Sequence, residues 1–174
     1  MKLNVKNNLF AWASISENGT VKGKKGDQTS NELKVGKYYN FGQTKLIRFT
    51  EPDKRKMIAE IAKTICKSNF CGYSQIDRNS LFNVCEKYEW NWNKLKKAIK
   101  EKTVPVANCD CSSLASAVVN LAYGKAIIPA CTTATIGGYV VKKGIAHIYA
   151  IEKVASFKKG DMPFKENKHI IINV

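Results

Sequence analysis

The stretch NCDCSSLASAVVNLAYG, residues 108–124, decides the fold, because it predicts a helix against which the rest of the chain packs. Its apolar residues recur at helical spacing and form one face: Leu114, Ala117, Val118 and Leu121. We expect a helix from Cys111 to Tyr123 that stops at Gly124. Cys111 then lies in the first turn, where unpaired N–H groups and partial positive charge favour a thiolate over a thiol.

The neighbours of Cys111 are compatible with two interpretations. The small side chains of Ser112 and Ser113 leave space for a substrate carbonyl, and the Cys111 backbone N–H is a candidate oxyanion donor. Free cysteines are more often small core residues, so Cys111 alone does not distinguish a nucleophile from a buried thiol. The other five cysteines form no CxxC pair, which argues against zinc, and we expect them in the core: Cys66, Cys71, Cys85, Cys109 and Cys131.

A nucleophilic cysteine needs a base that takes its proton and returns it to the leaving amine. The chain has two histidines. His169 opens the apolar strand HIIINV, soon after a turn at Gly160 and Asp161, whereas His147 lies within the apolar stretch IAHIYAI. Spacing alone does not separate these two candidates.

The whole chain, residues 1–174, is expected to form one α+β domain, with helices packed on one side of an antiparallel sheet. The β-rich segment 1–49 is part of this domain. Strands are predicted over 10–14, 33–39, 45–49, 146–151, 162–164 and 169–174, and helices over 78–88, 93–100, 111–123 and 133–142. A further helix is expected to begin after Thr50, with Asp53 completing a capping box and Pro52 in the first turn.

Charge is the unusual feature of the composition. The chain carries 29 Lys and Arg against 14 Asp and Glu, a net charge of +15, which favours polyanionic partners such as nucleic acid, an anionic membrane or a cell wall. The rival to an enzyme is a basic nucleic-acid-binding protein, with aromatic residues near lysines over 88–97. Because no RRM, KH, zinc-finger or helix-turn-helix pattern is present, we expect no nucleic-acid partner. No apolar run reaches the ~18 residues of a membrane span.

The order of these features resembles a known group of enzymes. A DCSS stretch opening a helix, followed by a Gly-Asp turn and a strand that begins with His169, resembles NlpC-type and CHAP-type cell-wall peptidases of the papain-like superfamily. The segments ENGTVKGKKGDQTSNEL (residues 17–33) and GYSQIDRNSLF (residues 72–82) are similar to those of phage or prophage endolysins of low-GC Gram-positive hosts. The resemblance extends from Ala13 to Val174.

The resemblance implies a papain-like fold, with Cys111 as nucleophile and His169 as general base and acid. The thiolate would attack an amide of the peptidoglycan stem, at an endopeptidase site or at the N-acetylmuramoyl-L-alanine amidase bond; an acyltransferase of the same superfamily is the alternative enzyme. No cofactor or metal is expected. The candidates for lining the site are Asp27, Gln28, Tyr73, Gln75, Asp110 and Ser112, although Asp27 and Gln28 also suit a structural turn.

Papain-like sites commonly orient the imidazole with a third polar group. Asn173 shares the His169 face of the last strand, but four residues at ~3.3 Å each separate the two by roughly 13 Å. The third partner is therefore unassigned, with Glu17 and Asp27 as candidates. Residues 1–12 lack a signal-peptide core, so we expect synthesis in the cytoplasm and action at the wall after release. The net charge of +15 would supply affinity for anionic wall polymers.

Overall fold

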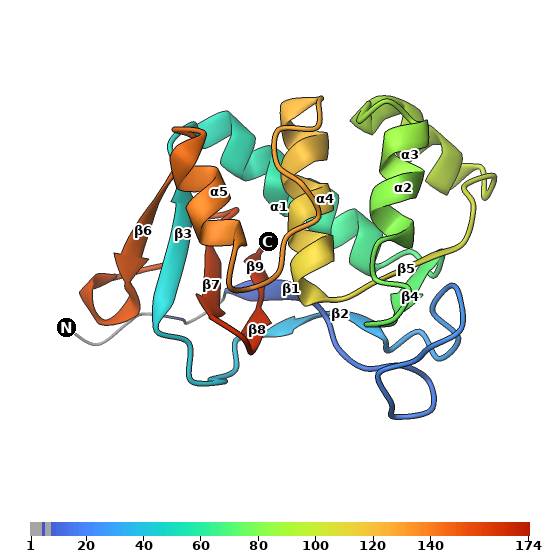
Figure 1. The fold of residues 1–174 in the computed structure, drawn as a ribbon, viewed down its shortest axis with the longest axis horizontal. Helices are drawn as coiled ribbons and strands as arrows, with labels where there is room; N and C mark the ends of the chain where they lie inside the picture. The colour runs from blue at the N-terminus through green and yellow to red at the C-terminus, as the bar shows by residue number, and fades with distance from the viewer. Residues whose placement is uncertain (1–4, 6–7) are drawn as a thin grey trace.

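The structure is a computed structural model that describes residue 5 and residues 8–174. In this part of the chain, five α-helices gather on one side of the strands (Figure 1). The helices are α1 (Pro52–Cys66), α2 (Ser80–Lys87), α3 (Trp92–Lys100), α4 (Cys111–Tyr123) and α5 (Ile136–Lys142). The strands are β1 (Leu9–Ala13), β2 (Leu33–Lys37), β3 (Lys45–Phe49), β4 (Cys71–Tyr73), β5 (Ala107–Cys109), β6 (Ala146–Ala150), β7 (Met162–Lys165), β8 (His169–Ile170) and β9 (Ile172–Asn173). This is the predicted α+β class. No helix in the described residues is long and apolar enough to cross a membrane.

The strands form three sheets rather than the single one expected. Two are antiparallel, with strand orders β2-β1-β9 and β6-β3-β7-β8. The third is a parallel pair, β4 and β5, in which Tyr73 lies opposite Cys109. The prediction left both β4 and β5 out, because three-residue strands carry too few residues for an alternating pattern. This small sheet leads directly into α4.

The predicted strand over 169–174 is wrong as one element, because it changes sheets in the middle. Ile170 pairs with Phe164 of β7, whereas Ile172 and Asn173 pair with β1. Between them the Ile171 N–H donates to the Pro163 carbonyl at 3.2 Å. Residues 170–173 are all buried, as expected for a segment covered on both faces. The C-terminal segment thereby joins the two antiparallel sheets, with His169 at its start.

The predicted capping box at the start of α1 is also wrong. The N-cap is Glu51, and no side chain caps the helix, although Pro52 is its first residue as expected. Thr50 instead donates its N–H and its hydroxyl to the Ile145 carbonyl, at 2.9 and 3.2 Å. Thr50 therefore ties the entrance of α1 to the segment that leads into β6.

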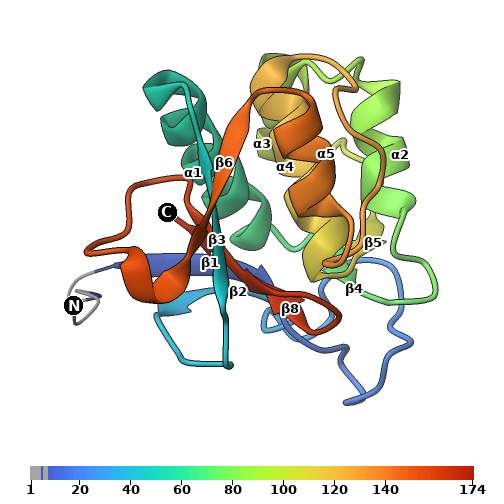
Figure 2. The same ribbon diagram turned by 60° about the vertical axis from the view of Figure 1, so that its left-hand side comes forward.

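Helix α4 lies at the centre of the molecule (Figures 1 and 2). Eleven of its residues, from Ser112 to Ala122, are buried, which is typical of a helix surrounded by other elements. It packs against α1, α2, β1 and β8. Its end is set by Gly124, which adopts a left-handed conformation with φ of 68°, as predicted. The first turn of α4, with Cys111, faces β8.

Candidate active site

A pocket of about 300 Å³ surrounds the first turn of α4. It brings together six of the residues that the sequence singled out: Tyr73, Gln75, Asp110, Cys111, Ser112 and His169. Six further lining residues were not predicted: Ala13, Ser14, Thr132, Thr133, Asn167 and Lys168. They come from the end of β1, the loop after α4 and the turn before β8, so only the folded chain brings them to Cys111.

Cys111 is the first residue of α4 and the one cysteine of the six that is not fully buried. The backbone N–H of Ile170 on β8 faces its sulfur. Burial raises the pKa of the Cys111 thiol to about 12, and the Asp110 carboxylate adds to this rise. The sequence predicted that the helix N-terminus would favour a thiolate; burial outweighs that effect, so the resting group is a neutral thiol.

Asp110 organises the backbone donors at this helix end. Its carboxylate accepts the N–H groups of Ser112 and Ser113 at 3.0 and 2.7 Å, and the Ser113 hydroxyl accepts the Asp110 N–H at 2.9 Å. This is a reciprocal capping box. The Leu114 N–H donates to the Asp110 carbonyl at 3.0 Å. In the described part of the chain the Cys111 N–H has no acceptor, which leaves it free to bind an oxyanion in the pocket.

His169 lies beside Cys111 on β8, between aromatic rings. The Phe41 ring meets the imidazole edge to face at 5.1 Å, and the Tyr39 ring lies 6.2 Å away between centroids. Burial lowers the pKa of His169 to about 4, although the Asp110 carboxylate acts to raise it. The buried Nε2 atom has no hydrogen-bond partner among the described residues. The imidazole is therefore neutral and able to accept a proton.

His147, the other histidine, lies elsewhere. It is exposed on β6, an edge strand, and its ring contacts Tyr149 at 6.4 Å between centroids. It does not line the pocket of Cys111. The fold thus supplies the distinction between the two histidines that spacing could not.

Acidification should destabilise the protein through His169. The unfolded imidazole titrates near 6.5 and the folded one near 4, so the unfolded chain binds more protons between these values. The contribution of the neutral His169 to the free energy of unfolding is fully present above pH 6.5 and is lost as the pH falls toward 4. Between pH 7 and 4.5 the free energy of unfolding should fall by about 2 kcal/mol more in the wild type than in His169→Gln. Urea unfolding at both pH values measures this difference, and equal losses would contradict it.

Tyr73 and Gln75 form one wall of the pocket. The Gln75 amide nitrogen donates to the Tyr73 hydroxyl at 2.9 Å, and the Gln75 backbone N–H donates to the Val21 carbonyl at 2.8 Å. Tyr73 ends β4, next to Cys109 of β5, so the parallel pair sets its position. Gln75 is exposed and Tyr73 is buried, which leaves the amide as the accessible group.

Asp27 and Gln28 do not line the pocket. The Asp27 carboxylate accepts four backbone N–H groups, those of Thr29, Asn31, Glu32 and Leu33, at 3.1 to 3.2 Å. The Gln28 amide donates to the Lys25 and Gly26 carbonyls, at 3.0 and 3.2 Å. The structure therefore gives both side chains the turn-building contacts that were the alternative interpretation.

Glu17, the other candidate for the third partner, also lies outside the pocket. Its carboxylate accepts the Lys24 N–H at 3.0 Å, and its own N–H donates to Glu32 at 3.0 Å. The fully buried Glu32 carboxylate also accepts the Tyr73 N–H at 2.7 Å, and burial raises the pKa of Glu32. The acidic residues of the 14–32 loop hold this loop against β4; neither Glu17 nor Asp27 is hydrogen-bonded to His169.

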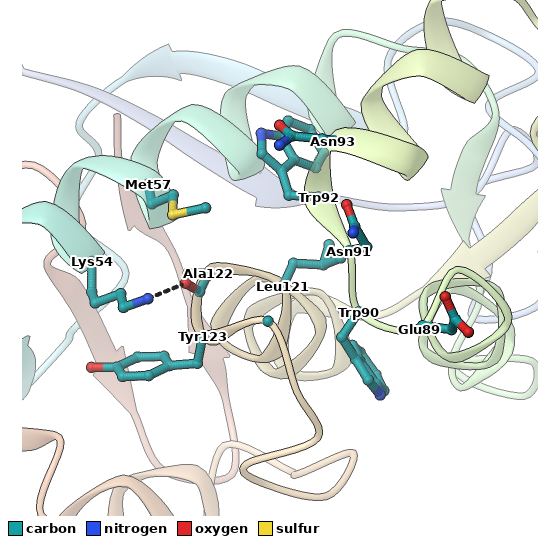
Figure 3. A pocket seen from close by; sticks show the side chains of 11 residues that line it. Lys54, Met57, Glu89, Trp90, Asn91, Trp92, Asn93, Leu121, Ala122 and Tyr123 are labelled. Carbon is teal, nitrogen blue, oxygen red and sulfur yellow. Dashed lines mark hydrogen bonds between the residues drawn. The ribbon is translucent and has the colours of Figure 1, made fainter.

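A second pocket, of about 260 Å³, lies at the opposite end of α4 (Figure 3). Lys54 donates to the Ala122 carbonyl there at 3.0 Å, and its ammonium lies 5.1 Å from the centre of the Tyr123 ring. Trp90 and Trp92 complete one side of it, both buried. Its lining residues include no cysteine or histidine, so the Cys111 pocket is the candidate active site.

Comparison with known families supports the endolysin part of the resemblance seen in the sequence. Residues 10–174 match the family described as Endolysin-like domain, so the chain belongs to this family. Membership suggests a hydrolase with a cell-wall lytic role. Searches of curated proteins and of solved structures found no match.

Proposed function

We propose that this chain is a cysteine-dependent peptidoglycan hydrolase of the papain-like, NlpC or CHAP type. One observation carries the proposal: in an endolysin-like domain, Cys111 at a helix N-terminus and His169 on an adjoining strand line the same pocket. A thiol and an imidazole in one pocket form the minimal pair for nucleophilic attack on an amide. The substrate would be an amide of the wall peptide. The net charge of +15 would attract the protein to the anionic polymers of the cell wall.

The reaction begins from a neutral pair, because burial favours both uncharged forms. When the substrate carbonyl enters, His169 takes the Cys111 proton as the sulfur attacks the carbonyl carbon. The negative oxygen of the tetrahedral intermediate binds at the free Cys111 N–H. His169 then returns the proton to the leaving amine, and the C–N bond breaks to leave a thioester. Water, deprotonated by His169, releases the acid and restores the thiol.

The third partner of the usual triad has no assigned residue in this mechanism. Phe41 and Tyr39 flank the imidazole and restrict its rotation by packing. This packing holds the ring plane, and the proposed mechanism uses a Cys111–His169 dyad. Asn173 does not serve as the missing group, because its side chain accepts a hydrogen bond from Asn8 at 3.2 Å, beside β1.

The proposal is tested by alkylating the protein with iodoacetamide before incubation with purified Gram-positive sacculi. Cys111 is the partly exposed thiol, so alkylation should occur there first, and peptide mapping should locate it. Protein alkylated only at Cys111 should release no fragments. Masses of the fragments from unmodified protein would distinguish an endopeptidase from an amidase. Undiminished release by the alkylated protein would overturn the proposal.

A further inference from the structure

Arg78, in the turn between β4 and α2, contacts the first turn of α4 and the loop beyond it. Its Nε donates to the Asp110 carboxylate at 2.6 Å. Its Nη2 donates to the same carboxylate at 3.3 Å and to the Ser112 hydroxyl at 3.0 Å. The same nitrogen donates to the Cys131 carbonyl. The guanidinium fork thus joins three groups with fixed geometry, which a lysine ammonium could not reproduce.

The Arg78–Asp110 ion pair is shielded from solvent, with side-chain exposures of 21 and 15%. Asp110 and Ser112 flank Cys111 in the chain, so the guanidinium lies next to the nucleophile without lining the pocket itself. The Asp110 carboxylate raises the pKa of both Cys111 and His169. A cation bonded to this carboxylate opposes its field at both groups.

The contact with Cys131 fixes a second wall. Thr132 and Thr133 follow Cys131 in the chain, and both line the pocket. The Cys131 N–H is also bound, by the Ser116 hydroxyl at 3.0 Å. Ser116 belongs to α4. The Cys131 N–H is therefore bonded to α4 itself, and the Cys131 carbonyl is bonded to Arg78, which in turn binds the start of α4. Loss of Arg78 would remove one of the two hydrogen bonds that hold the Cys131 backbone.

We propose that Arg78 is a positioning residue of the Cys111 site, which balances the Asp110 carboxylate and fixes the first turn of α4 against the 129–133 loop. This inference rests on the proposed function for its effect on turnover. Its effect on the thiol is independent of any substrate. Loss of Arg78 should make Cys111 harder to deprotonate and misplace the threonines that face the substrate.

Several titratable groups surround Cys111 and must be considered together. They come from its own helix cap, from β8 and the turn before it, from the segment after β2 and from the parallel strands: Asp110, His169, Lys168, Tyr39, Tyr73 and Cys109. Lys168 acts on His169 and lowers its pKa. Arg78 is the cation hydrogen-bonded to Asp110, and its removal changes the charge next to the sulfur most directly.

The experiment compares Arg78→Gln with wild type in two assays. The first is the rate of Cys111 alkylation by iodoacetamide from pH 7 to 10, which needs no peptidoglycan. The second is turnover of sacculi. In Arg78→Gln we expect alkylation at pH 8 to be about tenfold slower, equivalent to a shift of about one pH unit, and turnover to be about 100-fold lower. Wild-type values in both assays would overturn the inference.

A double variant separates charge from simple damage to the fold. Asparagine caps helices as well as aspartate does, so Asp110→Asn removes the charge and keeps a cap. If Arg78 acts by balancing Asp110, the Arg78→Gln/Asp110→Asn double variant should recover alkylation to within about threefold of wild type. No recovery would contradict the charge-balancing role, because a purely structural defect would persist in the double variant.

Arg48 provides a matched control. It forms a similar ion pair with the buried Asp161, with Nε to Oδ1 at 2.9 Å, and neither residue lines the Cys111 pocket. Arg48→Gln should lower stability and leave the pH dependence of alkylation unchanged. If Arg78→Gln does not fold, Arg78→Lys decides: alkylation near wild type with about tenfold lower turnover supports the inference, and wild-type turnover overturns it.

The two proposals fail in different ways. If Cys111→Ala still solubilises sacculi, the proposed function is wrong, while alkylation still measures the effect of Arg78 on the thiol. If Cys111→Ala is inactive but Arg78→Gln matches wild type in both assays, only the role of Arg78 is wrong.

Discussion

Replacing Cys111 with alanine should lower peptidoglycan hydrolysis by at least about 1,000-fold, because no other group in the pocket can form the thioester. The pocket offers Ser14, Ser112 and two threonines as further hydroxyl nucleophiles. The Ser112 hydroxyl is already bound to Asp110 at 3.0 Å and to Arg78 at 3.0 Å, so it is a poor substitute. Release of soluble fragments from sacculi measures the rate, and circular dichroism checks that the variant is folded.

Cys109→Ala is the matched control for this variant. Cys109 lies two residues away, but it is fully buried on β5, with its sulfur 3.5 Å from that of Cys71. Burial raises the pKa of its thiol well above the ordinary value, and Cys109 does not line the pocket, so it has neither the base nor the substrate that Cys111 meets there. We expect activity within about threefold of wild type and a stability loss of about 1 kcal/mol. Wild-type hydrolysis by Cys111→Ala, or an inactive Cys109→Ala, would contradict the assignment of the nucleophile.

The central helix and its two ends were predictable from short-range information. The apolar spacing and Gly124 set the limits of α4, and the structure has the same limits, Cys111–Tyr123. The Asp110 cap could also have been found, since Asp110 precedes Ser113 by three residues in a capping-box spacing. Local patterns of this kind depend on contacts within a few residues, which the sequence displays directly.

The surroundings of the site depend on long-range contacts and could not be predicted in this way. Arg78 and Asp110 are 32 residues apart in the chain, and no motif connects them. The neutral state of Cys111 depends on burial under β8, whereas the sequence displays only the helix N-terminus and therefore predicted a thiolate. In the 14–32 loop, Asp27 lies in a segment that resembles endolysins and was therefore a candidate for lining the site. Its carboxylate instead accepts backbone N–H groups of a turn, and it does not line the pocket.

Replacing His169 with alanine should lower turnover by about 1,000-fold, the second large effect, whereas His147→Ala should stay within about threefold of wild type. With the thiol pKa raised to about 12, Cys111 has little thiolate at neutral pH and needs a base in the pocket. His169 is that base, and it stays neutral down to about pH 4. His147 is exposed on β6 and contacts Tyr149 instead.

The pH dependence of the His169→Ala variant adds a second check. Without the imidazole, attack requires a thiolate formed by solvent, so the residual rate should rise about tenfold per pH unit between pH 7 and 10. The wild type should show no such rise, because its base is available throughout this range. A wild-type rate that climbs with pH as steeply as the variant would mean that His169 does not take the Cys111 proton. An inactive His147→Ala variant together with an active His169→Ala variant would instead assign the role of base to His147 on β6. His147 does not line the Cys111 pocket, so this result would also require a different arrangement of the site.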